Sequence, residues 1–461
     1  MIGRGLRWLF PRDPKTNAAV FFDLADKVWT AGGGLVTAFL IVAHFTARTQ
    51  GFYYTFFGLL GLQVLGELGL GTVIVQFAAH EWSKLRLDDT GGIAGDSTSA
   101  SRLRSLVRLG LRWCLWSGAL TAVALGVGGV AFLHGQSGGE EWFWPWVLQC
   151  AIAGASLALV PLSSIVEGTN QVARLYGFRL AVRVLSSLAT WLAIVRGAGL
   201  WIIPLAGTVS LLGTTLFLAL SYRAFLESLC QRPAGPRIDW RREMLPMQWR
   251  IAVSWISGYL SFYFAVPVLF KFSSPEVAGR FGLSRSLVFA AGACATSWLW
   301  PRVPTLASLA AGRQREAVER LHFAIVARVI TVMISLSAGL WLVVLTAAEL
   351  GVPQAERVLE PMPFGILLLG HVIQVASTPF AAYMRAHRTE PLAAIAVVHS
   401  ILSLVTTLVF AAHWQALGAA LSYLAVNVLL APVSFWIWAR CRRLWYGDEP
   451  ARPLGTAGAT T

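Results

Sequence analysis

Apolar residues recur along this chain in long uninterrupted runs, separated by short polar stretches rich in Arg, Gly and Pro. A run of about 20 apolar residues is the length that an α-helix needs to cross the hydrocarbon core of a bilayer. The pattern therefore predicts an all-α polytopic membrane protein. It contains twelve such runs, near residues 28–47, 52–79, 111–133, 143–166, 175–195, 199–222, 251–270, 281–301, 322–346, 362–384, 391–412 and 416–439.

The composition agrees with this class. Hydrophobic residues make up 56% of the 461 positions and charged residues only 13%, whereas soluble domains carry about 25% charged residues. The eight His residues do not fall in a metal-binding spacing, the five Cys residues form no CxxC pair, and no nucleotide-binding or hydrolase motif occurs. We therefore expect neither catalysis nor a cofactor nor a metal site.

The formal net charge of +14 has an ordered distribution. If residues near the ends of spans are counted with the nearest connection, all but six of the 37 Lys and Arg residues belong to the two tails and to alternate connections between the predicted spans. By the positive-inside rule this places both termini in the cytoplasm, and an even number of spans agrees with that placement. The basic residues then face the anionic headgroups of membrane lipids, so nucleic acid is not the expected partner.

A polar connection with three prolines, residues 226–246, separates the first six predicted spans from the last six. Two halves of equal span number and the same orientation indicate parallel internal duplication. We expect an N-terminal six-helix lobe over 1–225, a cytoplasmic linker over 226–246, a C-terminal lobe over 247–445 and a cytoplasmic tail over 446–461. Residues 83–108, rich in Ser, Thr, Gly, Asp and Arg, are expected to form a flexible cytoplasmic loop.

The second predicted span contains polar residues at membrane depth. Gln63 and Glu67 are four residues apart and share one face of a helix. A carboxylate near the bilayer centre costs about 2.5–3.5 kcal/mol on insertion scales, so it usually faces a protein interior or a water-filled path. Two interpretations stay open for Glu67: a structural hydrogen bond to a neighbouring helix, or a polar substrate and coupling pathway.

Basic residues inside the spans suggest a site for an anion. Arg179 and Arg183 lie on one face of the fifth span, and Arg binds phosphate oxygens through two parallel hydrogen bonds. They are candidates for a diphosphate headgroup, the alternative being that both extend to the membrane surface. Arg280 and Arg285 of the eighth span are candidates for a second headgroup site, with the same alternative.

Two histidines are candidates for proton coupling. His371 lies in the tenth span and His399 in the eleventh, and a membrane-embedded His can carry a proton. The alternative is a hydrogen bond between helices, which is the commoner role of such residues.

Three stretches carry a family resemblance: GFYYTFFGLLGLQVLGELGLGTVIVQFAAHEW (51–82), residues 278–314, and AAYMRAHRTEP (381–391), with Arg388 where the family usually has Lys. They resemble bacterial oligosaccharide flippases, the Wzx-type branch of the superfamily that includes the MATE exporters. The resemblance implies two six-helix lobes around a central cavity that opens alternately to either side of the inner membrane. It also implies a polyprenyl-diphosphate-linked oligosaccharide as substrate, with a polysaccharide polymerase and glycosyltransferases as partners in surface polysaccharide synthesis.

Two other functions stay open. A MATE-like cation or drug antiporter needs a carboxylate-rich cavity, whereas Glu67 is the single acid deep in a predicted span. A non-transporting scaffold for a glycan assembly complex would keep its activity when the residues of the cavity are changed. Transport is thus the leading hypothesis, and the Arg residues favour an anionic cargo.

Overall fold

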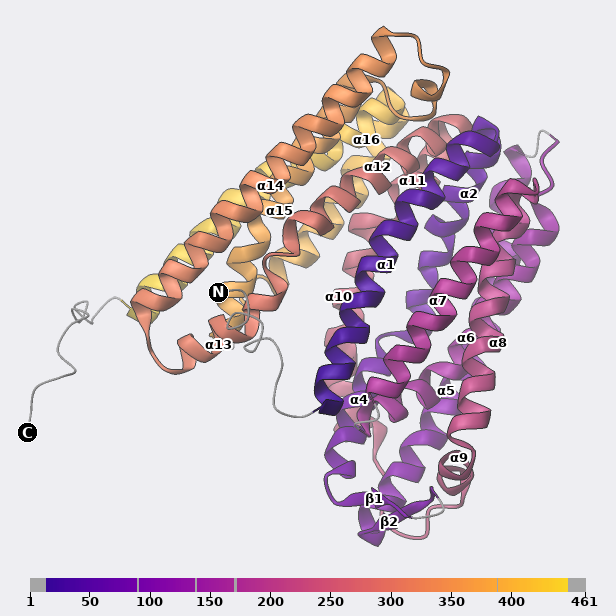
Figure 1. Ribbon diagram of the computed structural model, residues 1–461, viewed down its shortest axis with the longest axis vertical. Coiled ribbons are helices and arrows are strands. Elements are labelled where there is room, and N and C mark those ends of the chain that lie inside the picture. The colour runs from indigo at the N-terminus through magenta and orange to yellow at the C-terminus, as the bar shows by residue number, and fades with distance from the viewer. Residues whose placement is uncertain (1–13, 89–90, 137–138, 170–171, 388, 447–461) are drawn as a thin grey trace, which may run out of the picture. The chain divides into compact units, whose positions relative to one another are not determined.

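The computed structural model describes residues 14–88, 91–136, 139–169, 172–387 and 389–446. By its internal contacts the chain divides into two compact units, Met1–Gly282 and Leu283–Thr461, and the boundary falls within one helix, α12. These two parts are called unit 1 and unit 2, and Figure 1 labels their helices and strands.

Unit 1 consists of helices and one short β-hairpin. Its hairpin pairs β1 (Leu85–Leu87) antiparallel with β2 (Ile93–Gly95). Its main helices are α1 (Pro14–His44), α2 (Ala47–Leu60), α3 (Val64–Glu67), α4 (Leu70–Trp82), α5 (Ser97–Leu133), α6 (Phe143–Gly168), α7 (Val172–Val195), α8 (Ile202–Ser221), α9 (Arg223–Cys230), α10 (Leu245–Phe262), α11 (Ala265–Phe272) and the start of α12 (Pro275–Thr296). Single-turn helices η2 (Gly61–Gln63) and η5 (Trp240–Met244) precede α3 and α10.

Small residues bring α5 and α6 close together. A Cβ atom added to Gly118 would meet the backbone oxygen of Gly154, and one added to Gly154 would meet that of Gly118. Membrane helices use such small residues because lipid gives no hydrophobic force between helices, so packing must supply the attraction. The opposite face of α5 exposes large apolar side chains, including Trp116 and Leu120, as a lipid-facing surface requires.

Residues 83–108 do not form the flexible loop expected from their polar composition. They form the β1–β2 hairpin, and α5 begins at Ser97, where the Asp96 side chain accepts a hydrogen bond from the Ser99 N–H. Arg102 then bonds both Glu81 at the end of α4 and Glu243 in η5, at 2.7 and 2.6 Å. The basic residues that suggested a loop are instead the contacts that order this segment.

The predicted boundary between the lobes, 226–246, differs from the boundary between the two units. In unit 1, α10 packs against α3 and α4, and α11 packs against α2. The sequence assigns α10 and α11 to the second half of the chain, but their contacts group them with the first. The division into two six-helix lobes stays a prediction.

Unit 2 contains the end of α12, α13 (Val303–Ala311), α14 (Arg315–Glu349), η7 (Pro353–Arg357), α15 (Pro361–Ala386) and α16 (Ala393–Tyr446). Helix α16 reverses direction at Trp414 and Gln415, which have non-helical backbone angles. Across this point the Ser422 hydroxyl hydrogen-bonds to Thr406 and Thr407, at 2.6 and 3.0 Å. In a straight helix 15 residues span about 22 Å, so these bonds require the two halves to lie side by side.

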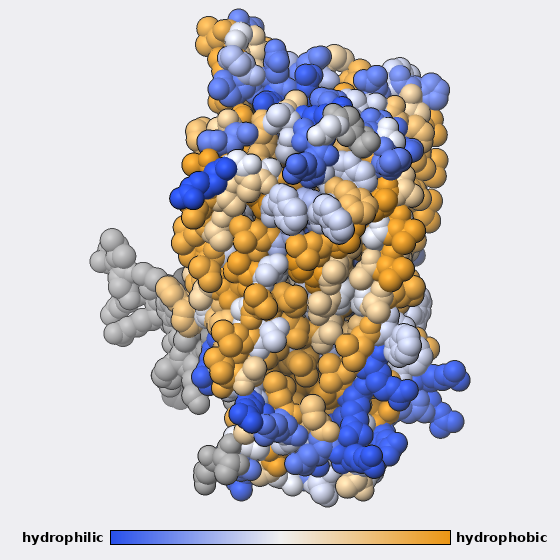
Figure 2. Space-filling model, turned by 90° about the vertical axis from the view of Figure 1, so that its right-hand side faces the viewer, coloured by the Kyte–Doolittle hydropathy of each residue, from blue (hydrophilic) through white to orange (hydrophobic). Residues whose placement is uncertain are grey.

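Eight helices of the described chain are long and apolar enough to cross a membrane, or ten if two bent pairs each count as one span. On the face in Figure 2, apolar residues form a broad band with hydrophilic residues above and below it. These features are those of a multi-pass membrane protein, as predicted. A total of twelve spans is consistent with this architecture.

Candidate functional site: two adjoining cavities in unit 1

A break in the second predicted span positions Glu67. Helix α3 ends at Glu67, Leu68 and Gly69 take left-handed φ angles of 48° and 69°, and the chain bends by 43° into α4. The Glu67 carboxylate accepts a hydrogen bond from the N–H of Gly71 in the first turn of α4. Because the first turn of a helix has unpaired N–H groups and partial positive charge, this position stabilises a carboxylate within an apolar bundle.

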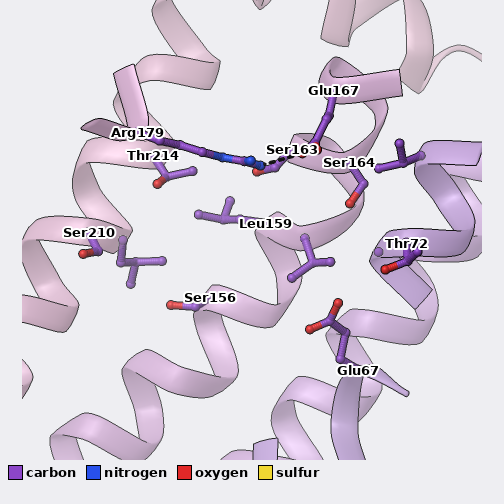
Figure 3. Close-up of a pocket in the computed structure, with 14 residues that line it drawn as sticks. Glu67, Thr72, Ser156, Leu159, Ser163, Ser164, Glu167, Arg179, Ser210 and Thr214 are labelled. Carbon is purple, nitrogen blue, oxygen red and sulfur yellow. Dashed lines mark ion pairs between the residues drawn. The ribbon is translucent and has the colours of Figure 1, made fainter. Parts of the chain in front are cut away.

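Glu67 faces a first cavity of about 430 Å³, between α4, α6, α7 and α8. Figure 3 shows Glu67 on one side of this cavity and Arg179 with Glu167 on the other. Most of the remaining polar lining consists of hydroxyl groups, from Thr72, Ser156, Ser163, Ser164, Ser210 and Thr214. The first cavity thus combines two acids, one guanidinium and a wall of hydroxyls.

A second cavity of about 590 Å³ adjoins the first, since Arg179, Ser210 and Thr214 line both. Arg183 lines only this second cavity, and its position four residues after Arg179 places both guanidinium groups on one face of α7. Aromatic rings, an amide and further hydroxyls complete the lining, from Tyr53, Phe57, Gln149, Ser186, Ser187, Thr190 and Thr37. The predicted pairing of the two arginines on one face is therefore present, and the face is turned to a cavity.

Each of these two arginines contacts a carboxylate on another helix. Arg179 Nη2 lies 3.0 Å from Glu167 Oε2 at the end of α6, and Arg183 Nε lies 2.6 Å from Asp26 Oδ1 in α1. The Tyr176 hydroxyl donates a hydrogen bond of 3.1 Å to Glu167 Oε1. The arginine side chains remain 41% and 47% exposed, so an incoming anion has access to both.

The other candidates of unit 1 lie outside these cavities. Gln63 belongs to η2, is half-buried, and is not among the residues that line either cavity. Arg280 lies on the first part of α12, and its Nε is buried without a hydrogen-bond partner in the described part of the chain. Neither is brought together with Arg179.

In unit 2 two of the remaining candidates, Arg285 and His371, belong to one closely packed cluster of side chains. The Arg285 guanidinium lies 4.9 Å from the centre of the Phe289 ring, which is 4.7 Å from the ring of His371. His371 Nδ1 and the Tyr423 hydroxyl are 2.8 Å apart, and that hydroxyl also bonds Gln374. His399 is separate from this contact and lies 3.4 Å from the Ser403 hydroxyl one turn along α16.

The acids that pair with Arg179 and Arg183 were not foreseen. Glu167 and Asp26 flank predicted spans, where a sequence alone gives no sign of the helix they face. The Ser and Thr residues of α6 to α8 offered a signal, because they recur on successive turns of apolar helices. Among the described residues, no three His, Cys, Asp or Glu side chains lie close enough together to hold a metal ion.

Comparison with known proteins identifies the fold. Neither a family model nor a curated protein matches the sequence. Solved structures do match: the inward-facing conformation of a multidrug resistance MATE family transporter of the MOP superfamily, at TM-score 0.62 and 13% identity, covers 94% of this chain and 96% of its own. The lipid II flippase MurJ in an inward closed conformation matches at TM-score 0.63 and 12% identity, covering 94% of each chain. A MATE structure in a bent conformation matches at TM-score 0.55 and 14% identity, with 96% and 98% covered.

These matches confirm the predicted fold class, since they extend over almost the whole chain. The chain thus has a fold similar to those of a MATE family transporter and of the lipid II flippase MurJ. At this level of identity the likeness concerns the fold, and function has to be argued from the site.

Proposed function

We propose that this protein is a flippase that moves a polyprenyl-diphosphate-linked oligosaccharide across the bacterial inner membrane, with both termini in the cytoplasm. Transport would proceed by alternating access, for the synthesis of a surface polysaccharide. The observation that carries the proposal is the pair Arg179 and Arg183, on one face of α7 and open to adjoining cavities. Guanidinium groups bind phosphate oxygens in a fork geometry, which suits a diphosphate.

The lining of the cavities supports a sugar as the attached group. Hydroxyl side chains both donate and accept hydrogen bonds, as sugar hydroxyls do, and they surround the arginines on α6, α7 and α8. Tyr53 and Phe57 add flat apolar surface in the second cavity. The polyprenyl chain needs no site of its own, because it remains in the bilayer while the polar part crosses.

Glu67 is proposed as a coupling residue of the same route. It is the acid of the first cavity that forms no ion pair in the described structure, and it lies where the span is broken. A change in its protonation would alter the hydrogen bond to Gly71 and thus the start of α4. His371 and His399 stay coupling candidates from the sequence, and Arg280, Arg285 and Gln63 stay candidates for substrate contact.

The experiment that tests this function uses a deletion strain. Mass spectrometry would measure the pool of polyprenyl-linked glycans, and a label that reaches only the outer face would report which of them have crossed. We expect complete lipid-linked glycans to accumulate and to stay unlabelled. An unchanged pool with normal labelling would contradict a role in translocation.

The carboxylates of the first cavity favour one second candidate, a cation-coupled drug or metabolite antiporter. Glu67 and Glu167 both line that cavity and would attract a cationic cargo. Such a protein should alter drug tolerance when deleted and leave the glycan pool unchanged. A panel of cationic drugs on the same deletion strain therefore separates the two functions.

A further inference from the structure

Arg179 and Arg183 are not free cations awaiting a phosphate, because each contacts an acid on another helix. We propose that Glu167 and Asp26 are built-in competitors for the headgroup: a diphosphate binds by displacing them, and their return to the arginines expels it. This inference rests on the proposed function, and it concerns how the site releases its ligand.

The first argument is the charge of the site. Arg179, Arg183, Glu167 and Asp26 together carry no net charge when all are ionised, so the two acids offset the attraction of the arginines for a dianion. A diphosphate reaches the exposed guanidinium groups, but it binds both of them fully only if the two carboxylates give up their contacts with the arginines. Binding therefore involves an exchange of anions on the same two cations.

The second argument is geometry. Glu167 and Asp26 come from α6 and α1, which both pack against α7, and the arginines that they contact also line the cavities. The arginine side chains are 41% and 47% exposed, and ion pairs with an exposed member are worth about 0–1 kcal/mol in general. A ligand in the cavity can therefore compete with each acid for its arginine.

The third argument is that a second contact holds Glu167 beside the cavity. The Tyr176 hydroxyl bonds Glu167 Oε1, while Arg179 occupies the other oxygen. When a ligand takes Arg179, this second bond keeps the carboxylate beside the cavity. Transport needs a headgroup to be released as well as bound, and an acid within reach provides that release.

The competition depends on the negative charge of the two carboxylates, so removing that charge by substitution should tighten diphosphate binding. The ionisable groups facing Glu167 are Arg179 and Tyr176 from α7, with Glu67 of α3 in the same cavity. Helices α4 and α8 contribute only uncharged lining residues there. Asp26 faces Arg183, and Lys27 follows it on α1.

The experiment measures binding of farnesyl diphosphate to the full-length protein in nanodiscs, with farnesol as the uncharged comparison. The test variant is D26N/E167Q, in which both side chains keep an oxygen that accepts hydrogen bonds. We expect about 25-fold tighter binding near pH 7.5, from about fivefold for each of the two ion pairs.

Two controls keep the outcomes distinct. The substitution Glu227→Gln removes the same charge from an exposed pair with Arg223 and should leave binding unchanged. The variant R179Q/R183Q should abolish the preference for farnesyl diphosphate over farnesol. If it does not, the arginines are not a headgroup site and the proposed function loses its main support.

If R179Q/R183Q does weaken binding but D26N/E167Q fails to tighten it, the competitor role alone is overturned. Turnover gives a second readout that a purely structural role would not produce. The variant D26N/E167Q should bind more tightly yet transport more slowly, because release is delayed. Equal or faster transport together with tighter binding would also contradict the proposal.

Discussion

The polar residues of unit 1 and those of unit 2 lie in different surroundings. In unit 1, Glu67, Arg179 and Arg183 open onto two adjoining cavities lined by hydroxyl groups. In unit 2, His371 packs against Phe289 and bonds Tyr423, whose hydroxyl also contacts Gln374. The polar side chains of unit 1 border cavities, whereas His371 of unit 2 is enclosed by other side chains.

This difference teaches how to interpret an ionisable residue within a membrane span. A polar group whose hydrogen bonds go to neighbouring helices stabilises the packing of those helices, while a polar group beside a cavity is available to a ligand. From sequence alone both the arginines and the histidines were candidates for function. Their surroundings favour the arginines and Glu67, and four experiments test this distinction.

The largest effect is expected from R179Q/R183Q. Each arginine offers charge-assisted hydrogen bonds worth about 1.5–3 kcal/mol, so losing both should weaken diphosphate binding at least a hundredfold. Binding of farnesyl diphosphate to the purified protein measures this, and size-exclusion chromatography checks that the variant is folded. Unchanged affinity would mean that both side chains merely extend to the membrane surface.

Glu67→Gln should lower transport about tenfold and leave the amount of folded protein in the membrane unchanged. Glutamine keeps an oxygen to accept the Gly71 N–H but cannot exchange a proton in the physiological range. The rate at which lipid-linked glycan reaches the outer face would be compared between variant and wild type. Normal transport would remove Glu67 from the mechanism and leave it a structural cap.

Ser284→Ala tests the packed side of the comparison. The Ser284 hydroxyl, fully buried in unit 2, accepts a hydrogen bond of 2.8 Å from the N–H of Leu359. Leaving that N–H unpaired should cost about 1–3 kcal/mol of stability and lower the thermal unfolding midpoint. The matched change Ser210→Ala, at a hydroxyl that lines both cavities, should leave the midpoint unchanged. If Ser284→Ala and Ser210→Ala lowered the unfolding midpoint equally, the distinction between the packed cluster and the cavity lining would be wrong.

The smallest effect is expected from His371→Gln on the pH dependence of transport. Because the imidazole is enclosed by Phe289 and Tyr423, we expect the pH profile of the variant to match that of the wild type. The profile of Glu67→Gln should flatten under the same conditions. If His371→Gln flattens it instead, coupling belongs to unit 2, as the sequence allowed.

The sequence was sufficient for the fold class because apolar runs and the lengths of helices follow directly from the thickness of a bilayer. It was insufficient for the break at Leu68 and Gly69. A left-handed φ at a leucine is unfavourable locally and persists through contacts elsewhere in the bundle. The β1–β2 hairpin was missed because its short strands lie in a polar stretch that favours a loop.

Arg179 and Arg183 were identified from their spacing, since four residues along a helix bring two side chains to one face. Their acids were not, because Asp26 lies more than 150 residues away from Arg183 along the chain. Pairing between helices depends on how the bundle packs, which a single sequence does not specify. The same reason explains why Glu67 lines a cavity and Gln63 does not, although the sequence predicts one helix face for both.

The reversal at Trp414 and Gln415 has a consequence for how the protein enters the membrane. With two non-helical residues between the halves of α16, the chain has almost no length to place outside the bilayer at this point. The hydrogen bonds of Ser422 with Thr406 and Thr407 join the two halves close to this point, so they can form as soon as both halves are made. We therefore expect the two halves to be inserted together as a preassembled helical hairpin during biosynthesis, and never one without the other.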